Sequence, residues 1–146
     1  MSIIAIDFTI EEAVKLISCC NQAIVNIEDR MHDGGIETIR PSINGITLKG
    51  SLDMIWEIKT KIKENIIKSL GQSTKHDITI RLDLKEWIKL NGCFNSAIET
   101  EEKTIGLLPS NCACITTCNE SIQKIIDIKC KIKHTLIEKY EYFLYS

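Results

Sequence analysis

The chain lacks the features that would place it in or across a membrane. No apolar run approaches the roughly 20 residues that a membrane-spanning helix needs, and no basic segment precedes the apolar residues at the N-terminus, as it would in a signal peptide. The cysteines number seven, an odd count without an export signal, which favours reduced thiols over a disulfide framework. A net charge of -2 and 26% charged residues are ordinary for a globular domain. We therefore expect an intracellular protein with no membrane partner.

Recognisable catalytic and metal-binding patterns are missing as well. None of the three histidines stands with a serine or a carboxylate in a way that suggests a triad, so we expect no enzyme and no catalytic residues. A zinc site can be imagined from Cys112, Cys114, Cys118, Cys130 and His134. Their spacing matches no standard pair of ligands, and the earlier half of the chain has no counterpart. We expect ordinary thiols, with no metal and no cofactor.

A helix-turn-helix over residues 84–98 is also disfavoured. Its recognition helix would carry Glu99, Glu101 and Glu102 and no arginine, which does not suit a negatively charged duplex.

What the chain has instead is an internal repeat. Residues 51–70 and 121–140 share the pattern Ile-x-(Glu/Asp)-Ile-Lys-x-Lys-Ile-Lys, and residues 5–24 align with residues 79–98 without a gap. Shared runs at a fixed offset indicate that one unit has been duplicated.

The two units are expected to share a core, because a unit of about seventy residues is marginal on its own. The sequence therefore predicts a single pseudo-symmetric domain over residues 1–146. Repeat one covers residues 3–70, and repeat two covers residues 77–140.

Each repeat is predicted to begin with a half-buried strand, since apolar and polar residues alternate there. The inward residues of the two strands are Ile4, Ile6 and Phe8, and Ile78, Ile80 and Leu82. Capping boxes then begin a helix in each repeat, with Thr9 and Glu12 in the first and Asp83 and Glu86 in the second. In the second repeat, Asn91 and Gly92 are expected to end that helix after about two turns.

Three short strands are predicted next in each repeat, because short apolar segments are bounded by turn residues. These are residues 23–28, 38–40 and 46–48, and residues 97–101, 104–107 and 114–116. Asn44-Gly45 could form a hairpin turn.

A long helix is expected to close each repeat. An isoleucine-rich stripe faces one side, and Lys61 and Lys131 fall opposite it. A strand remains the alternative, because residues 56–63 and 126–133 also alternate.

The expected fold is therefore α+β: one curved antiparallel sheet with helices on one face, built by a tandem duplication of a unit of strand, helix, three strands and helix. This order resembles the core of the TATA-box-binding protein family across nearly the whole chain. The closest local likeness is residues 41–50, which run into the lysine-rich helix that ends at Lys68-Ser-Leu-Gly71.

The resemblance implies a DNA-binding transcription factor whose concave sheet contacts the minor groove and whose helices contact transcription proteins. That family wedges phenylalanines into DNA, whereas here Leu107 and Leu108 would have to serve. The DNA-contacting residues expected on the small, lightly basic face are Ala5, Arg40, Thr47, Thr79, Arg81, Leu107, Leu108 and Thr116.

The lysine rows of the two long helices are candidates for binding an acidic partner. They consist of Lys59, Lys61, Lys63, Lys129, Lys131 and Lys133. A solvated helix face is the plainer interpretation. A protein of another class also fits the sequence: a non-enzymatic, inhibitor-type protein that has lost DNA binding and holds another protein or a small ligand between its copies.

DNA binding through the sheet can be tested with AT-rich and GC-rich duplexes at two salt concentrations. We expect a preference for AT-rich DNA and a shallow salt dependence of about two to four released counterions. Arg81→Glu should weaken binding to every AT-rich duplex alike, and Leu107→Ala should mainly reduce bending. Equal binding to both duplexes, together with no effect of Arg81→Glu, would favour the interaction-protein alternative.

Overall fold

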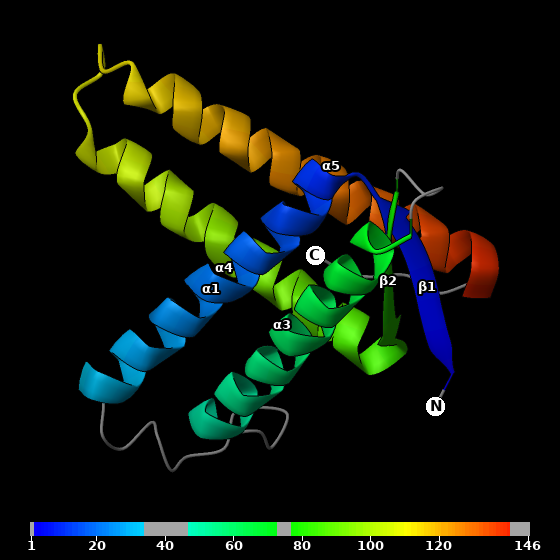
Figure 1. Ribbon diagram of the computed structural model, residues 1–146. Coiled ribbons are helices and arrows are strands. Elements are labelled where there is room, and N and C mark those ends of the chain that lie inside the picture. Colours follow the sequence, from blue (N-terminus) through cyan, green and yellow to red (C-terminus); the bar gives the residue numbers. More distant parts are fainter. Residues whose placement is uncertain (1, 34–46, 73–76, 141–146) are drawn as a thin grey trace.

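The chain forms two helical hairpins joined through a two-stranded ribbon (Figure 1). The computed structural model describes residues 2–33, 47–72 and 77–140. Within them the elements are β1 (Ile3–Phe8), α1 (Ile10–Asp33), α3 (Leu48–Leu70), β2 (Ile78–Asp83), α4 (Leu84–Leu107) and α5 (Cys114–Tyr140). A strand followed by two helices thus occurs twice. Helix α1 lies antiparallel beside α3, α4 lies antiparallel beside α5, and α1 crosses α4.

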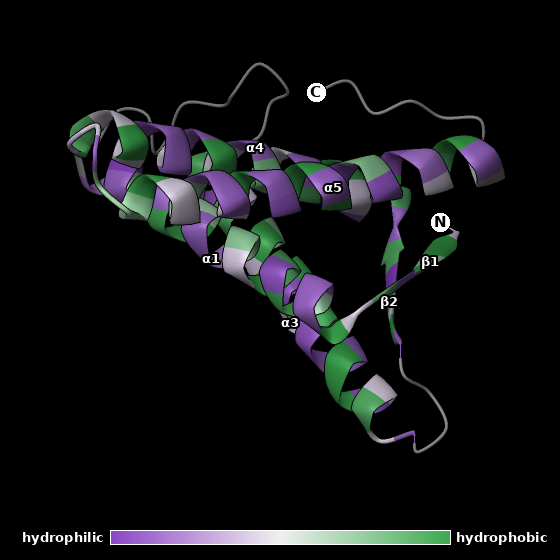
Figure 2. Cartoon of the chain, turned by 90° about the horizontal axis from the view of Figure 1, so that it is seen from above, coloured by the Kyte–Doolittle hydropathy of each residue, from purple (hydrophilic) through white to green (hydrophobic). Residues whose placement is uncertain are grey.

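The register of the ribbon relates the two copies to each other. Strands β1 and β2 are antiparallel, and Ile6 lies opposite Ile80. These two isoleucines are equivalent positions of the sequence repeat, so any local twofold axis must pass between them. Ile4 lies opposite Leu82 and Phe8 lies opposite Ile78, as that symmetry requires. Figure 2 shows the two hairpins diverging like a V, with the ribbon across its open side.

The inner face of the ribbon packs into the core. The prediction for which strand residues point inward is confirmed, because Ile4, Ile6, Phe8, Ile78, Ile80 and Leu82 are all buried. Trp87 on α4 is fully buried over this face, and its Nε1 donates a hydrogen bond of 3.1 Å to the carbonyl oxygen of Ile4. The indole thereby fills the core without leaving its polar group unpaired.

Both predicted capping boxes are confirmed. Glu12 Oε1 accepts a 2.8 Å hydrogen bond from the backbone N–H of Thr9, whose hydroxyl accepts one of 3.1 Å from the N–H of Glu12. Asp83 and Glu86 exchange the same pair of bonds at 2.9 and 3.0 Å. Each box satisfies two backbone donors at the point where a strand turns into a helix.

The two lysine-rich segments are helices, so the strand alternative for residues 56–63 and 126–133 is wrong. Their apolar stripes face the core as predicted. The buried members are Ile55, Ile58 and Ile62 of α3 and Ile125, Ile128, Ile132 and Leu136 of α5.

The predicted curved sheet is wrong. The described residues contain a sheet of two strands only, and the segments assigned to further strands lie in helices. Residues 23–28 belong to α1, residues 97–101 and 104–107 to α4, and residues 114–116 to α5. The physical reason is the helical spacing of the buried residues, which continues through Ala23 and Ile24 in α1 and through Ala97 in α4.

The predicted end of a helix at Gly92 is also wrong, because α4 continues without a break to Leu107. Glycine in a helix costs about 1 kcal/mol relative to alanine. Burial of Cys93, Phe94 and Ala97 directly after it outweighs that cost. A helix-turn-helix over residues 84–98 is excluded by the same continuity.

Part of the sequence prediction lies outside the described residues. This applies to the strand at residues 38–40, to Arg40 and to the Asn44-Gly45 turn. Of the strand predicted at residues 46–48, Thr47 is the N-cap of α3 and Leu48 is its first residue. The division into one domain of two superposable repeats stays a prediction. In the described parts of the chain, no helix combines the length and the apolarity needed to cross a bilayer.

The core position of Ile62 gives a direct stability test. Ile62 is fully buried, so Ile62→Ala should lower the free energy of unfolding by about 2–5 kcal/mol, as a large-to-small core change does. Ile67 on the same helix is 71% exposed, and Ile67→Ala should cost under about 0.5 kcal/mol. Urea denaturation measures both, and equal costs would contradict the assigned helix face.

Candidate partner-binding surface

Two lysine–glutamate pairs join the copies at equivalent positions. Lys61 Nζ of α3 lies 2.6 Å from Glu86 Oε2 at the start of α4, and Lys131 Nζ of α5 lies 3.1 Å from Glu12 Oε1 at the start of α1. Each pair connects the second helix of one copy to the capping box of the other. Lys131 Nζ also lies 4.9 Å from the centre of the Phe8 ring.

These contacts shift the pKa values of Glu12 and Lys61. Burial by itself would raise the pKa of Glu12, but hydrogen bonds from Thr9 and Lys131 outweigh it, and the pKa falls below its usual value. The hydrogen bond to Glu86 raises the pKa of Lys61. Both groups therefore stay charged over a wider pH range, and the contribution of Glu12 to stability is lost as the pH falls through its lowered pKa.

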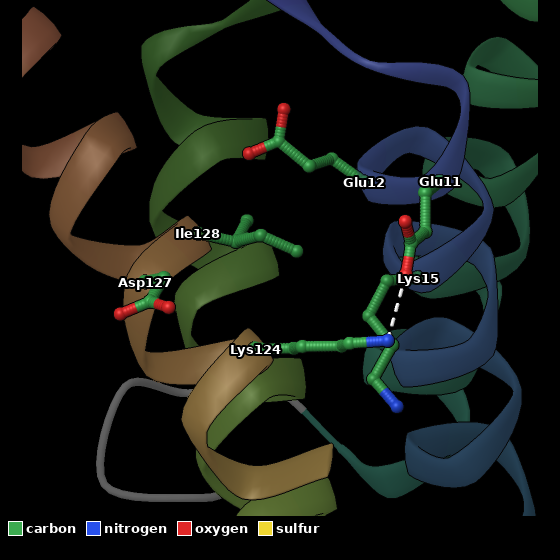
Figure 3. Close-up of a pocket in the computed structure, with 6 residues that line it drawn as sticks. All are labelled: Glu11, Glu12, Lys15, Lys124, Asp127 and Ile128. Atoms are coloured by element: carbon green, nitrogen blue, oxygen red, sulfur yellow. Dashed lines mark hydrogen bonds and ion pairs between the residues drawn. The ribbon is translucent and has the colours of Figure 1, made fainter. Parts of the chain in front are cut away.

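Two lysine–serine contacts also occupy equivalent positions in the two copies. Lys15 Nζ donates a 2.6 Å hydrogen bond to Ser121 Oγ, and Lys89 Nζ donates one to Ser51 Oγ. Around Lys15, α1 and α5 enclose a cavity of about 180 Å³ that Glu11, Glu12, Lys124 and Asp127 also line (Figure 3).

Figure 3 shows Lys124 reaching across this cavity from α5 to α1. Its Nζ lies 2.7 Å from Glu11 Oε1. The cavity therefore already contains carboxylates beside the positive charges of Lys15 and Lys124.

The predicted partner-binding lysines are divided between different environments. Lys61 and Lys131 do not lie opposite the core as predicted, since both are half-buried in the ion pairs above. Lys59 Nζ lies 4.5 Å from the centre of the Trp56 ring, and Lys129 donates a 2.6 Å hydrogen bond to Asn95 Oδ1. Lys63 and Lys133 are exposed.

The predicted DNA-contacting residues are brought together only in part. Ala5 lies opposite Arg81 on the outer face of the ribbon, with Thr79 one step along that face. Thr79 is buried and donates a 2.6 Å hydrogen bond to Asp7 Oδ1. The others lie at helix ends, not in a sheet: Thr47 caps α3, Leu107 and Leu108 end α4, and Thr116 lies in the first turn of α5.

Helices α1 and α3 carry a row of large apolar side chains that the sequence interpretation missed. On α1, Ile10, Val14 and Val25 are about half exposed, at 51%, 56% and 48%. On α3, Trp56 and Leu70 are 45% and 59% exposed. Together with the other residues that continue the same spacing, these form what we call the copy-one face: Ile10, Val14, Ile17, Asn21 and Val25 with Leu52, Trp56, Lys59, Lys63, Ile66 and Leu70.

The spacing within each row places it on one side of its helix. Both rows advance by steps of three and four residues, which follow one face of an α-helix. Such a second stripe, outside the core stripe, is the signal in the sequence that could have revealed this surface.

Three hydrogen bonds indicate that the two rows lie on the same side of the hairpin. The opposite flank of α3 is covered by β2, because Asn65 Oδ1 accepts from the N–H of Arg81 and Ser69 Oγ accepts from the N–H of Thr79. In the other copy, the hydrogen bond from Lys129 to Asn95 spans α5 and α4. Lys59 and Asn21 are the equivalent positions in the copy-one face.

The equivalent surface of the second copy, which we call the copy-two face, is more polar. Its α4 row is Leu84, Ile88, Asn91, Asn95 and Glu99, and its α5 row is Ile122, Ile126, Lys129 and Lys133, with the buried Leu136 at the position equivalent to Ile66. Asparagine and glutamate replace Ile17 and Val25, and isoleucine replaces Trp56. The two copies share a core and differ in what they expose.

Two adjacent cysteines of α1, Cys19 and Cys20, are buried thiols. Burial raises the pKa of Cys19 to about 12, and contact with Cys93 together with burial raises the pKa of Cys20, so both remain neutral thiols. Across residues 2–33, 47–72 and 77–140, no group of three histidine, cysteine or acidic side chains is arranged to hold a metal ion.

Comparison with protein-family models, curated proteins and solved structures finds no match for this chain. The resemblance to the TATA-box-binding family therefore stays a prediction, although the sheet that it implied is not the fold.

The Lys61–Glu86 contact should matter more for stability than a surface pair. Lys61→Met removes the ammonium from a carboxylate that is 5% exposed, and we expect a loss of about 1–3 kcal/mol instead of the near-zero cost of a solvated lysine. Lys103→Met breaks the exposed pair with Glu99 and should cost under about 0.5 kcal/mol. Urea denaturation of the two variants gives the comparison, and an equal or smaller loss for Lys61→Met would contradict the ion pair's role.

Proposed function

We propose that this chain is a non-enzymatic, intracellular protein that binds another protein through the copy-one face. The observation that carries the proposal is the row of half-exposed Ile10, Val14, Val25, Trp56 and Leu70 along two adjacent helices. Large apolar patches on a globular surface are typical of interaction sites, and tryptophan is among the residues that contribute most to binding. The matched face of the second copy replaces several of these residues with polar ones.

The partner is expected to present an amphipathic helix with acidic residues along its edge. A helix can lie along two antiparallel helices and bury its own apolar stripe against them, as in other cases where a helix is recognised by a hydrophobic surface. Lys59 and Lys63 stand on the α3 side of the face, and Lys59 already lies over the Trp56 ring. Their charge favours carboxylates on the edge of the bound helix.

DNA binding remains a prediction, and the described residues do not form the concave sheet through which it was expected. The concave sheet to which it was assigned is replaced by a ribbon of two strands in the described residues, and only Ala5, Thr79 and Arg81 share a face there. The interaction function is therefore the one that the geometry favours.

The proposal can be tested by selecting peptides of about 15 residues from a random display library on the immobilised protein. We expect enriched sequences to carry apolar residues at helical spacing together with aspartate or glutamate. Fluorescence polarisation then measures the affinity of the enriched peptides. Trp56→Ala and Val14→Asp should each weaken binding by about tenfold or more, as loss of a central contact does.

Matched changes in the copy-two face provide the control. Ile126→Ala and Ile88→Asp alter equivalent positions and should leave the affinity within about twofold. Equal losses for both sets, or no enrichment of acidic amphipathic peptides, would reject the proposal. So would sedimentation showing a dimer that Val14→Asp dissociates, because the face would then bind a second copy of this chain.

A further inference from the structure

A second cavity lies where α1, α3 and α4 meet. Its volume is about 200 Å³, and Ser51, Lys89, Gly92 and Ser96 are among the residues that line it, together with Arg30. Its charged lining residues, among those described, are Arg30 and Lys89, both cations. A cavity of this size exceeds the roughly 30 Å³ of one water molecule several-fold, so it has room for a small ligand.

Lys89 is held at this cavity without a carboxylate partner in the described residues. Its Nζ donates to Ser51 Oγ, which is a neutral group. Burial lowers the pKa of Lys89 more than the neighbouring Cys93 raises it, which is the direction expected for an ammonium with little compensating charge around it. An anion in the cavity would provide that compensation.

The residue equivalent to Lys89 in the first copy is Lys15, and its surroundings differ in charge. Lys15 makes the same lysine–serine contact, to Ser121, but its cavity is also lined by Glu11, Glu12 and Asp127. Those carboxylates repel an anion. The duplicated contact thus has carboxylates beside it at Lys15, whereas the described lining at Lys89 includes none.

Two serine hydroxyl groups at the cavity can donate a hydrogen bond to a ligand. Ser51 Oγ accepts from Lys89, and Ser96 Oγ accepts a 2.7 Å hydrogen bond from Asn26 Nδ2. Because each hydroxyl is already an acceptor, its own hydrogen is available for a ligand. Ser51 also lies close to the start of α3, where the helix dipole favours negative charge, and the first turn of α3 has no acidic residue.

We propose that this cavity is a binding site for a compact oxyanion, specifically a phosphate group. Lys89 Nζ provides a charge-assisted hydrogen bond, and the hydroxyls of Ser51 and Ser96 provide neutral ones. The adjoining cavity shares Arg30 and Ser96 but is also lined by Asp29 and Glu99, so the phosphate lies at the Lys89 end. The site is separate from the copy-one face and does not depend on its function.

Gly92 offers a way to block the site without changing its charge. A Cβ atom added at Gly92 meets no neighbouring atom within 4 Å, although the residue lines the cavity. Gly92→Met should therefore enter the open space, and replacing a glycine inside a helix also favours the helix by about 0.5–1 kcal/mol.

The test is an NMR titration of the whole ¹⁵N-labelled protein at pH 7 with inorganic phosphate and, separately, with glycerol 3-phosphate. Sodium chloride at matched ionic strength controls for general screening. We expect saturable shifts of the Ser51, Lys89 and Gly92 amides. Saturation by inorganic phosphate alone would indicate a site for the free ion, and tighter binding of glycerol 3-phosphate would indicate a phosphomonoester site.

Variants decide whether the cavity is responsible. Lys89→Gln and Gly92→Met should each weaken phosphate binding by about tenfold or more, while Lys15→Gln should retain the wild-type affinity. Circular dichroism checks that each variant keeps its helices. Shifts that do not saturate, shifts reproduced by chloride, or equal affinities for Lys89→Gln and wild type would overturn the proposal.

Discussion

The antiparallel pairing of β1 with β2 is the constraint on which the arrangement of the helices depends. It places Ile6 opposite Ile80, and both strands then turn directly into helices at their capping boxes. Because each capping glutamate also accepts a lysine from the other copy, the ribbon, the helix starts and the second helices are fixed relative to one another. Two hairpins that would be marginal alone thereby share a core.

The duplicated core is not filled identically in its two halves. Trp87 stands where the first copy has Ala13, and Phe8 stands where the second copy has Leu82. The Phe8 and Trp87 rings contact each other, with their centres 6.2 Å apart. The residues at the equivalent positions, Leu82 and Ala13, are both smaller, so the two halves of one close-packed interior are filled by different side chains.

The surfaces that carry the proposed functions also differ between the two copies. Where the copies agree, as in the lysine–glutamate pairs, the residues hold the fold together. Where they differ, as at Trp56 and at the surroundings of Lys89, one copy has a tryptophan in place of Ile126, or a lysine without the described carboxylates that line the cavity at Lys15. A duplicated structure can keep one copy for stability while the other acquires a binding surface.

Much of the helical framework could be predicted from the sequence because its signals are local. The capping boxes and the stripe through Ile55, Ile58 and Ile62 each arise from residues within a few turns, and the structure confirms them. The failures came from short apolar segments such as residues 97–101, which fit a strand and a buried helix equally well. The prediction that a helix ends at Gly92 was wrong because burial of the neighbouring residues outweighs the low helix propensity of glycine.

The candidate surface was harder to predict than the framework. The charge of the lysine rows predicted a partner-binding surface. Two of those lysines instead form ion pairs whose partners lie in the other repeat. Contacts between Lys61 and Glu86 depend on how the hairpins pack, which no local pattern specifies. The copy-one face did have a local signal in the spacing of Ile10, Val14 and Val25, but it could not be recognised as exposed before the core face of α1 was known.

Backbone NMR tests the central claim most directly. Residues 84–107 should show uninterrupted helical carbon shifts, and cross-strand Hα–Hα contacts should link Ala5 with Arg81 and Asp7 with Thr79, because these are the non-hydrogen-bonded pairs of the ribbon. Extended shifts at residues 97–101, or strand pairing of that segment with another part of the chain, would contradict the structure of two hairpins joined by a ribbon.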